Sequence, residues 1–282
     1  MLYVVRFLIL PLILVTASSV VNASEQPNYF GVINQRSIAL TAKYWNPILN
    51  YVSQKSGVPL KLRMGKTAPQ TTAMTVRGEH AFVYTNHMFT EERDKVGYQV
   101  ILRMQTPSIN AIIIVRDDSP IKSLQELKEQ QVAFPHSNAF VGYWVPMDHL
   151  IRSDISVKPT YAGNQEGAMA QVHHGKVVAA AVNKQVLERY ARRENFKYRG
   201  LWRSEPFLSI PIMAHPDLKQ YKVKAVRKAF IDMKKDPAGQ KILKASAAIL
   251  KHKNPLEFIY ADDDDYSNYR NFYRNTVVKK QQ

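Results

Sequence analysis

Residues 29–64 have the sequence YFGVINQRSIALTAKYWNPILNYVSQKSGVPLKLRM. Two short apolar runs, Tyr29–Ile33 and Pro59–Met64, flank a longer segment, Ile38–Lys55, in which apolar residues recur at helical spacing. Gly57 follows that segment, and glycine is a typical helix stop. Short strand-like runs on either side of an amphipathic helix predict a β-α-β unit.

The same alternation continues along the chain. Further strands are predicted at Ala81–Tyr84, Tyr98–Met104, Asn110–Val115, Gln131–Phe134, Val157–Tyr161, Val177–Val182, Tyr198–Trp202 and Phe207–Met213, with helices between most of them. Residues 223–250 are predicted to be helical with a break at Asp236-Pro237, because proline favours a new helix start. The aromatic residues from Tyr266 to Tyr273 have helical spacing and predict a docked terminal helix. Alternating strands and helices with short connections indicate an α/β fold whose sheets are covered by helices.

Composition narrows the class of protein. The chain has 282 residues, 45% of them hydrophobic, and no cysteine, so disulfides, thiolate metal sites and cysteine nucleophiles are excluded. The 39 Lys and Arg residues outnumber the 23 Asp and Glu residues, which gives a formal charge of +16. The cations are scattered and form no sustained basic block, so we expect no nucleic-acid partner.

The first residues indicate export. Arg6 precedes an apolar run, Phe7–Val15, that is too short to span a bilayer comfortably. Residues 21–23 have the small side chains that a signal peptidase recognises. We predict a signal peptide over residues 1–23, cleavage after Ala23 and a periplasmic mature protein, with an uncleaved anchor as the alternative.

Several segments of the chain resemble those of a known family. They are Tyr44–Leu49, Ser56–Val58, Arg77–Tyr84, Ser119–Leu124, Val132–Phe134, Gly142–Pro146, Ala162-Gly163 and Ala168–Ala170. Together they resemble the phosphate/phosphite/phosphonate-binding family among the periplasmic solute-binding proteins of ABC transporters. The resemblance extends over nearly the whole mature chain.

The resemblance implies a two-lobed type II periplasmic binding protein, in which each lobe is a mainly parallel sheet flanked by helices. Residues 24–108 with 207–282 would form lobe 1, and residues 109–206 would form lobe 2. Crossings near 106–110 and 203–211 would act as a two-strand hinge. The implied function is binding of a small solute of phosphonate or oxyanion type in the cleft by hinge closure, followed by docking on an ABC permease. We expect a monomer, no cofactor and no catalysis.

In the family, hydroxyl groups and backbone N–H groups at a helix amino terminus hold an oxyanion, as the helix dipole favours. The corresponding loop here is residues 136–142, which departs from the family by having Ala139, Phe140 and Val141 in place of hydroxyl residues. A buried dianion needs many donors. The substitutions therefore predict a less charged ligand with a more aromatic or apolar body.

Polar residues recur in the loops that follow predicted strands, where open α/β sheets bind ligands. With the loop and helix that begin at residue 136, they make up the candidate ligand-binding set: Lys66, Thr67, Tyr84, Thr85, Asn86, His87, His136, Ser137, Asn138, Phe140, Tyr143, Asn164, Gln165, Glu166 and Asn183. Several have an ordinary structural alternative. Tyr84 can close a buried strand, whereas Thr85, Asn86 and Asn164 can cap helices. Glu166 facing the cleft would repel an anion.

Three other functions were weighed against solute transport. A metal site is not expected, because His173 and His174 are adjacent and lack the i, i+4 spacing of paired helix ligands, and Asp262–Asp265 lacks the pattern of a calcium loop and is expected to be a solvated tail. A hydrolase with a spatially assembled site remains a second hypothesis, although no nucleophile motif is present. A ligand sensor that docks on a membrane sensor kinase or chemoreceptor remains a third.

Overall fold

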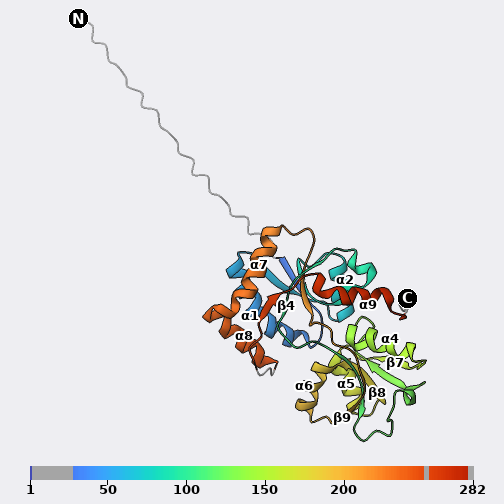
Figure 1. The fold of residues 1–282 in the computed structure, drawn as a ribbon. Helices are drawn as coiled ribbons and strands as arrows, with labels where there is room; N and C mark the ends of the chain where they lie inside the picture. The colour runs from blue at the N-terminus through green and yellow to red at the C-terminus, as the bar shows by residue number, and fades with distance from the viewer. Residues whose placement is uncertain (2–27, 251–253, 279–282) are drawn as a thin grey trace.

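The computed structural model describes Met1 and residues 28–250 and 254–278, which form two lobes built around one sheet each (Figure 1). The predicted signal peptide and its cleavage site lie outside these residues. No helix of the described part is long and apolar enough to cross a membrane.

The first sheet has six strands in the order β11-β4-β10-β3-β1-β2. Their bounds are Asn28–Val32 (β1), Leu60–Arg63 (β2), Phe82–Tyr84 (β3), Gln99–Met104 (β4), Pro211–Ala214 (β10) and Phe258–Tyr260 (β11). The helices of this lobe are Ile38–Ser56 (α1), Ala68–Val76 (α2), Glu91–Asp94 (α3), Gln220–Asp232 (α7), Pro237–Ile249 (α8) and Ser267–Asn275 (α9), with 3-10 turns at His87–Phe89 (η1), Met233–Lys235 (η4) and Asp264–Tyr266 (η5). Helices α1, α7 and α8 pack together over one face, with Phe30, Trp45 and Phe230 buried in the shared core.

The second sheet has five strands in the order β7-β6-β8-β5-β9. They are Ala111–Arg116 (β5), Gln131–Phe134 (β6), Lys158–Tyr161 (β7), Ala179–Asn183 (β8) and Tyr198–Arg203 (β9). The helical segments are Gln125–Leu127 (η2), the π-helical turn Phe140–Trp144 (η3), Val145–Arg152 (α4), Gln165–His173 (α5) and Lys184–Glu194 (α6). The buried strands β5 and β8 are almost entirely alanine, isoleucine and valine, which suits a sheet covered on both faces.

Most strands of each sheet point the same way, as expected, but both sheets are mixed. In the first sheet β1 is parallel to β2 and β3, but β10 is antiparallel to β3 and β4, and β11 is antiparallel to β4. In the second sheet β6 is parallel to β7 and β8, whereas β5 is antiparallel to β8 and β9. The reason is the path of the chain: β5 enters the second lobe and β10 returns to the first, so each comes into its sheet from the hinge side.

Helix α1 begins and ends where the sequence predicts. The Ser37 hydroxyl accepts a hydrogen bond from the backbone N–H of Leu40 at 3.3 Å, which caps the first turn. Gly57 ends the helix in the left-handed conformation with φ +68°, which costs glycine little. The capped start of the helix sets the end of the short β1–α1 loop, and Gly57 turns the chain toward β2.

Two chain segments, residues 105–110 and 204–210, cross between the lobes at the predicted places. They touch each other through an isolated antiparallel bridge in which Ile109 and Phe207 exchange backbone hydrogen bonds of 2.6 and 2.8 Å. The crossings therefore run side by side as a two-strand hinge.

A third connection comes from the end of the chain. We call residues 267–278, which comprise α9 and the three residues after it, the C-terminal strap. The phenol of Tyr269 donates to the backbone carbonyl of Leu208 in the hinge at 2.6 Å. Beyond α9, the Asp148 carboxylate of α4 accepts hydrogen bonds from the Thr276 hydroxyl at 2.7 Å and the Val277 N–H at 2.8 Å. The strap thus joins the first lobe, the hinge and the second lobe.

The predicted docking of a terminal aromatic helix is confirmed by α9, but the acidic run before it is not a solvated tail. The Asp262 carboxylate accepts hydrogen bonds from the backbone N–H groups of Asp264 and Asp265 at 3.1 and 3.3 Å. Asp263 forms an ion pair with Arg270 at 2.7 Å. The acidic residues are ordered because they satisfy N–H groups that have no partner at a helical start.

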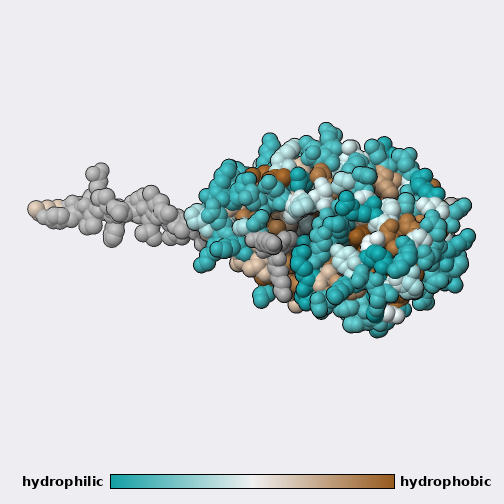
Figure 2. Space-filling view, turned by 60° about the horizontal axis from the view of Figure 1, so that its bottom comes forward, coloured by the Kyte–Doolittle hydropathy of each residue, from teal (hydrophilic) through white to brown (hydrophobic). Residues whose placement is uncertain are grey.

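The face shown in Figure 2 is mostly hydrophilic, with hydrophobic residues in small separate patches. Tyr221 and Tyr260 are examples of large side chains exposed singly, at 64% and 55% of their surface. Single exposed apolar residues are ordinary on a folded protein.

Candidate functional site

A cavity of about 440 Å3 lies between the lobes. Its walls come from the β1–α1 loop and α1 of the first lobe, from α6 of the second lobe, from both hinge segments and from residues 254–256. Binding sites of organic molecules commonly have about 300–1,000 Å3. We call this space the main cavity.

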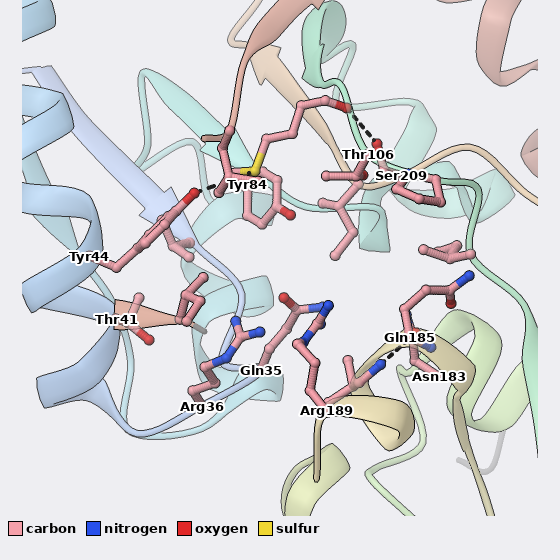
Figure 3. A pocket seen from close by; sticks show the side chains of 18 of the residues that line it. Gln35, Arg36, Thr41, Tyr44, Tyr84, Thr106, Asn183, Gln185, Arg189 and Ser209 are labelled. Atoms are coloured by element: carbon pink, nitrogen blue, oxygen red, sulfur yellow. Dashed lines mark hydrogen bonds between the residues drawn. The ribbon is translucent and has the colours of Figure 1, made fainter. Parts of the chain in front are cut away.

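The β1–α1 loop brings Gln35 and Arg36 to the main cavity. The loop follows the carboxyl end of a strand whose neighbours on both sides are parallel, which is where open α/β sheets place ligand groups. Figure 3 shows the Arg36 side chain extending into the pocket from this loop, with Gln35 beside it.

Helix α6 supplies the opposite wall. Asn183 caps this helix by accepting hydrogen bonds from the N–H groups of Gln185 at 2.9 Å and Val186 at 3.3 Å. Cavity-lining residues recur along one face of α6, and Arg189 and Arg192 belong to it. Burial lowers the pKa of Arg189 to about 10, and the positive charge of Arg36 adds to this effect. Arg36 and Arg189 thus line the same cavity from opposite lobes.

The arginines of the main cavity form no ion pair with a described carboxylate, although the charge of Glu188 acts on Arg189. Glu188 also lines the cavity, but its carboxylate pairs with Lys184 one turn earlier on α6. Three arginines and one glutamate leave a positive excess in a partly desolvated space. Such a surplus favours an anionic ligand.

Aromatic and aliphatic side chains form the remaining wall. The Tyr84 and Trp45 rings lie 5.1 Å apart between centroids, and Tyr44 packs edge-on against Trp45 at 5.3 Å. Burial raises the pKa of Tyr84 to about 12, so its phenol keeps the proton and acts as a neutral donor at pH 7. The Tyr44 hydroxyl is already engaged with the Met104 sulfur at 3.5 Å.

A second, much smaller cavity of about 30 Å3 adjoins the first and shares several lining residues with it. This minor cavity is close to the volume that one water molecule takes in the liquid. Its polar walls include His87 and His136, whose rings lie 5.4 Å apart. The Thr72 hydroxyl lies 2.8 Å from His87 Nδ1. Burial lowers the pKa of His136 to about 4 and that of His87 well below its ordinary value, so both rings are neutral at pH 7.

The loop of residues 136–142 closes this minor cavity on one side. Phe140 is 2% exposed and stacks on Tyr269 of the strap with 4.3 Å between ring centroids. Phe207 of the hinge packs edge-on against the Phe140 ring, with 4.7 Å between the centroids. Gly142 is required here, because a Cβ atom would lie 2.8 Å from side-chain atoms of both Gln165 and Pro135. The loop is packed tightly between α5 and the strap.

Comparison with known proteins decides the family. Residues 30–266 match the family model described as the periplasmic substrate-binding protein of phosphonate ABC transporters. The chain belongs to this family. It is therefore the periplasmic substrate-binding protein of an ABC transporter, referred to below as the receptor.

Solved structures agree with the receptor's fold. The binding component of an ABC phosphonate transporter from Pseudomonas aeruginosa superposes with a TM-score of 0.74 at 19% identity, over 88% of this chain and 86% of that one. PhnD1 from Prochlorococcus marinus, solved with methylphosphonate, gives 0.74 at 18% identity, over 88% and 97%. A Xanthomonas citri protein solved with ATP gives 0.70 at 18% identity, over 89% and 99%. No curated protein matches the receptor's sequence.

The structure brings about half of the predicted site residues to the two cavities of the receptor. Tyr84 lines the main cavity, Asn183 lines both, and Asn86, His87, His136, Phe140 and Gln165 line the minor cavity. Lining does not imply a free side chain: Gln165 Oε1 accepts from the Asn183 N–H at 2.8 Å.

The other predicted site residues of the receptor line neither cavity. They are Lys66, Thr67, Thr85, Ser137, Asn138, Tyr143, Asn164 and Glu166. Asn164 caps α5 by accepting from the Gly167 N–H at 2.9 Å, and Asn138 accepts from Arg93 at 2.9 Å. Glu166 forms two hydrogen bonds of 3.0 and 3.1 Å with Arg193. The polar groups of Asn164 and Glu166 are thus used within the second lobe, and that of Asn138 between the lobes.

Sequence reasoning missed the arginines of the receptor's main cavity. Arg36 stands in the first loop that follows a predicted strand, so the rule that selected Lys66 and Tyr84 also applies to it. Arg189 lies inside a charged helix, and only the packing of the lobes shows that its side of α6 faces the cleft.

Proposed function

We propose that the receptor binds its solute in the main cavity and closes its two lobes around it. The observation that carries this proposal is the origin of the cavity walls: the first lobe, the second lobe and both hinge segments all contribute. A ligand that touches both lobes binds the closed state better than the open one, and this difference in affinity drives closure. Residues 24–108 with 207–282 and residues 109–206 would be the moving bodies.

The proposed solute is a small molecule of phosphonate or oxyanion type. The positive excess of the main cavity supports this class. Among proteins of the same fold, methylphosphonate is held by the Prochlorococcus marinus protein and ATP by the Xanthomonas citri protein. The fold therefore accommodates anions of very different size, and the choice depends on the residues of each cleft.

The proposed partner is the ABC permease, which would recognise the closed and liganded receptor monomer. Export with cleavage after Ala23 would deliver the receptor to the periplasm. We propose no catalytic role, because the matched family consists of substrate-binding proteins. Family membership supports transport over the sensor and hydrolase hypotheses.

The test uses the exported receptor, purified and freed of ligand. Thermal unfolding is measured with phosphate, phosphonates, sulfonates, amines and amino acids, and closure is followed by small-angle X-ray scattering. A true solute raises the free energy of unfolding by about 2.7 kcal/mol at a hundredfold excess over Kd. It also lowers the radius of gyration. Binding without compaction, or compaction that a substitution in the main cavity leaves unchanged, contradicts the proposal.

A further inference from the structure

The main cavity places one unpaired arginine on each side of the cleft. Arg36 comes from the β1–α1 loop and Arg189 from α6, and Figure 3 shows both guanidinium groups extending into the same space. Neither has an ion-pair partner in residues 28–250 or 254–278. When the lobes approach each other, two like charges approach each other in a space that water is leaving, and this is unfavourable.

An anion between these groups reverses that effect. The flat guanidinium fork matches the oxygens of phosphonate, phosphate, sulfonate or carboxylate groups, and two forks can hold different oxygens of one group. The Tyr84 phenol lies in the same cavity and is a neutral donor. With the anion bound, closure brings two attractive contacts between arginine and anion, which offset the repulsion between the two arginines.

The minor cavity does not offer an alternative place for the charged group. It measures about 30 Å3, and its histidines are neutral at pH 7. The residues beside them, Ala139 and Val141, have no side-chain donor. An oxyanion would be larger than the space, and the cation beside it, Arg93, does not line the cavity and already donates to His87 and Asn138.

The rest of the main cavity fits an apolar body. Trp45, Tyr84 and Tyr44 form a continuous aromatic wall, to which Leu40 and Val186 add aliphatic surface from both lobes. The volume of about 440 Å3 is in the range that accommodates organic ligands, well beyond the needs of a one-carbon phosphonate.

We propose that the solute is an organic oxyanion with a ring-sized apolar body, and that its charged group bridges Arg36 and Arg189 so that closure requires the anion. This inference rests on the proposed function, because it concerns the same cavity. It adds the size of the solute and the residues that couple binding to closure.

The first test compares ligands that carry the anionic group, the apolar ring, or both. Calorimetric titration of the exported receptor uses phenylphosphonate, methylphosphonate and benzyl alcohol. We expect phenylphosphonate to bind at least about tenfold more tightly than either other probe, because it alone has both features. Arg36→Gln and Arg189→Gln should each weaken phenylphosphonate binding about tenfold or more. Lys43→Gln is the matched control, since it removes an exposed charge from α1 outside the cavity, and it should leave binding unchanged.

The second test needs no ligand. The chain has no cysteine, so Asn46→Cys on α1 and Lys197→Cys before β9 accept a pair of spin labels, one on each lobe. In the ligand-free receptor, the Arg36→Gln and Arg189→Gln double variant should shift the distance distribution toward the closed state, whereas Lys43→Gln should not.

The outcomes separate the two proposals. If benzyl alcohol or an amine closes the lobes as well as phenylphosphonate does, or if the double variant leaves the distances of the ligand-free receptor unchanged, the inference is overturned while the proposed function stands. If phenylphosphonate does not bind at millimolar concentration, the inference is also overturned. If no solute of any class binds in the cleft, the proposed function fails with it.

Discussion

The two ends of the cleft between the lobes differ in volume and in charge. At the end near the strap the lobes touch, the minor cavity is about 30 Å3, and its polar groups are neutral. At the other end, between α1 and α6, the main cavity is about 440 Å3 and carries unpaired arginines. Figure 1 shows α9 above α4 on one side of the molecule, with α8 and α6 toward the other. In the main cavity the arginines are available to a solute, whereas near the strap Arg93 is engaged in a hydrogen bond to Asn138 of the other lobe.

Disrupting the packing at the end of the cleft near the strap should have the largest effect on the free energy of unfolding. Tyr269→Ala removes a ring that packs on Phe140, Phe207 and Phe89, together with the hydrogen bond to Leu208. We expect a loss of about 3–5 kcal/mol in the free energy of unfolding, as for other large buried aromatic residues. Denaturant titration measures it. Tyr221→Ala, at a site 64% exposed, is the control, and equal effects of the two changes would contradict the role of the strap.

Lowering the pH should also destabilise the end of the cleft near the strap, where His136 lies. The folded protein holds the pKa of His136 near 4, below its ordinary value of 6.5, so the unfolded chain binds the proton first as pH falls. Stability is therefore full above pH 6.5 and is lost between about 6.5 and 4, by up to about 3 kcal/mol for this group. Denaturant titrations at several pH values measure the slope, and His136→Gln should reduce it. An unchanged slope would show that other groups dominate in that window.

Releasing the strap from the second lobe should have a moderate effect. Asp148→Asn weakens the hydrogen bonds to Thr276 and Val277 and the ion pair with Arg152. We expect a loss of about 1–2 kcal/mol of stability and a larger radius of gyration without ligand. Asp154→Asn on the same lobe serves as the comparison. Scattering curves that coincide with those of the unchanged protein would show that the strap does not limit opening.

The smallest expected effect lies at the charged end. Glu188→Gln removes the one acidic group among the described residues that line the main cavity. Removing a partly exposed, ion-paired charge changes electrostatic energies by about 0.2–1 kcal/mol, so phenylphosphonate should bind up to about fivefold more tightly. Titration at low and high salt checks the origin of the change, because an electrostatic gain shrinks as salt rises. Weaker binding would mean that Glu188 contacts the solute.

The sequence allowed much of the fold to be predicted, for local reasons. The start of α1 at Ile38 and its end at Gly57 depend on a capping serine and a glycine within the same segment. The direction of β10 depends instead on its return from the second lobe, so the sequence did not show which strands run against the others.

The candidate site was harder to predict because its residues meet only through packing. The sequence around Phe140 predicted a ligand contact; the ring lines the minor cavity and also packs on Tyr269, which lies 129 positions later in the chain. Arg36 and Arg189 are equally remote from each other in sequence. No local pattern shows that the loop after β1 and one face of α6 share a cavity.

The strap has a mechanical consequence. Asp148 ties the strap to α4 on one flank, and the two hinge segments lie between this flank and the main cavity. The lobes are thus attached to each other along one edge, formed by the strap and the hinge segments, and they separate by rotating about that edge. A small rotation about this edge produces a larger displacement at α1 and α6. The surface around the cavity mouth there is therefore the part that best distinguishes the liganded receptor from the free one.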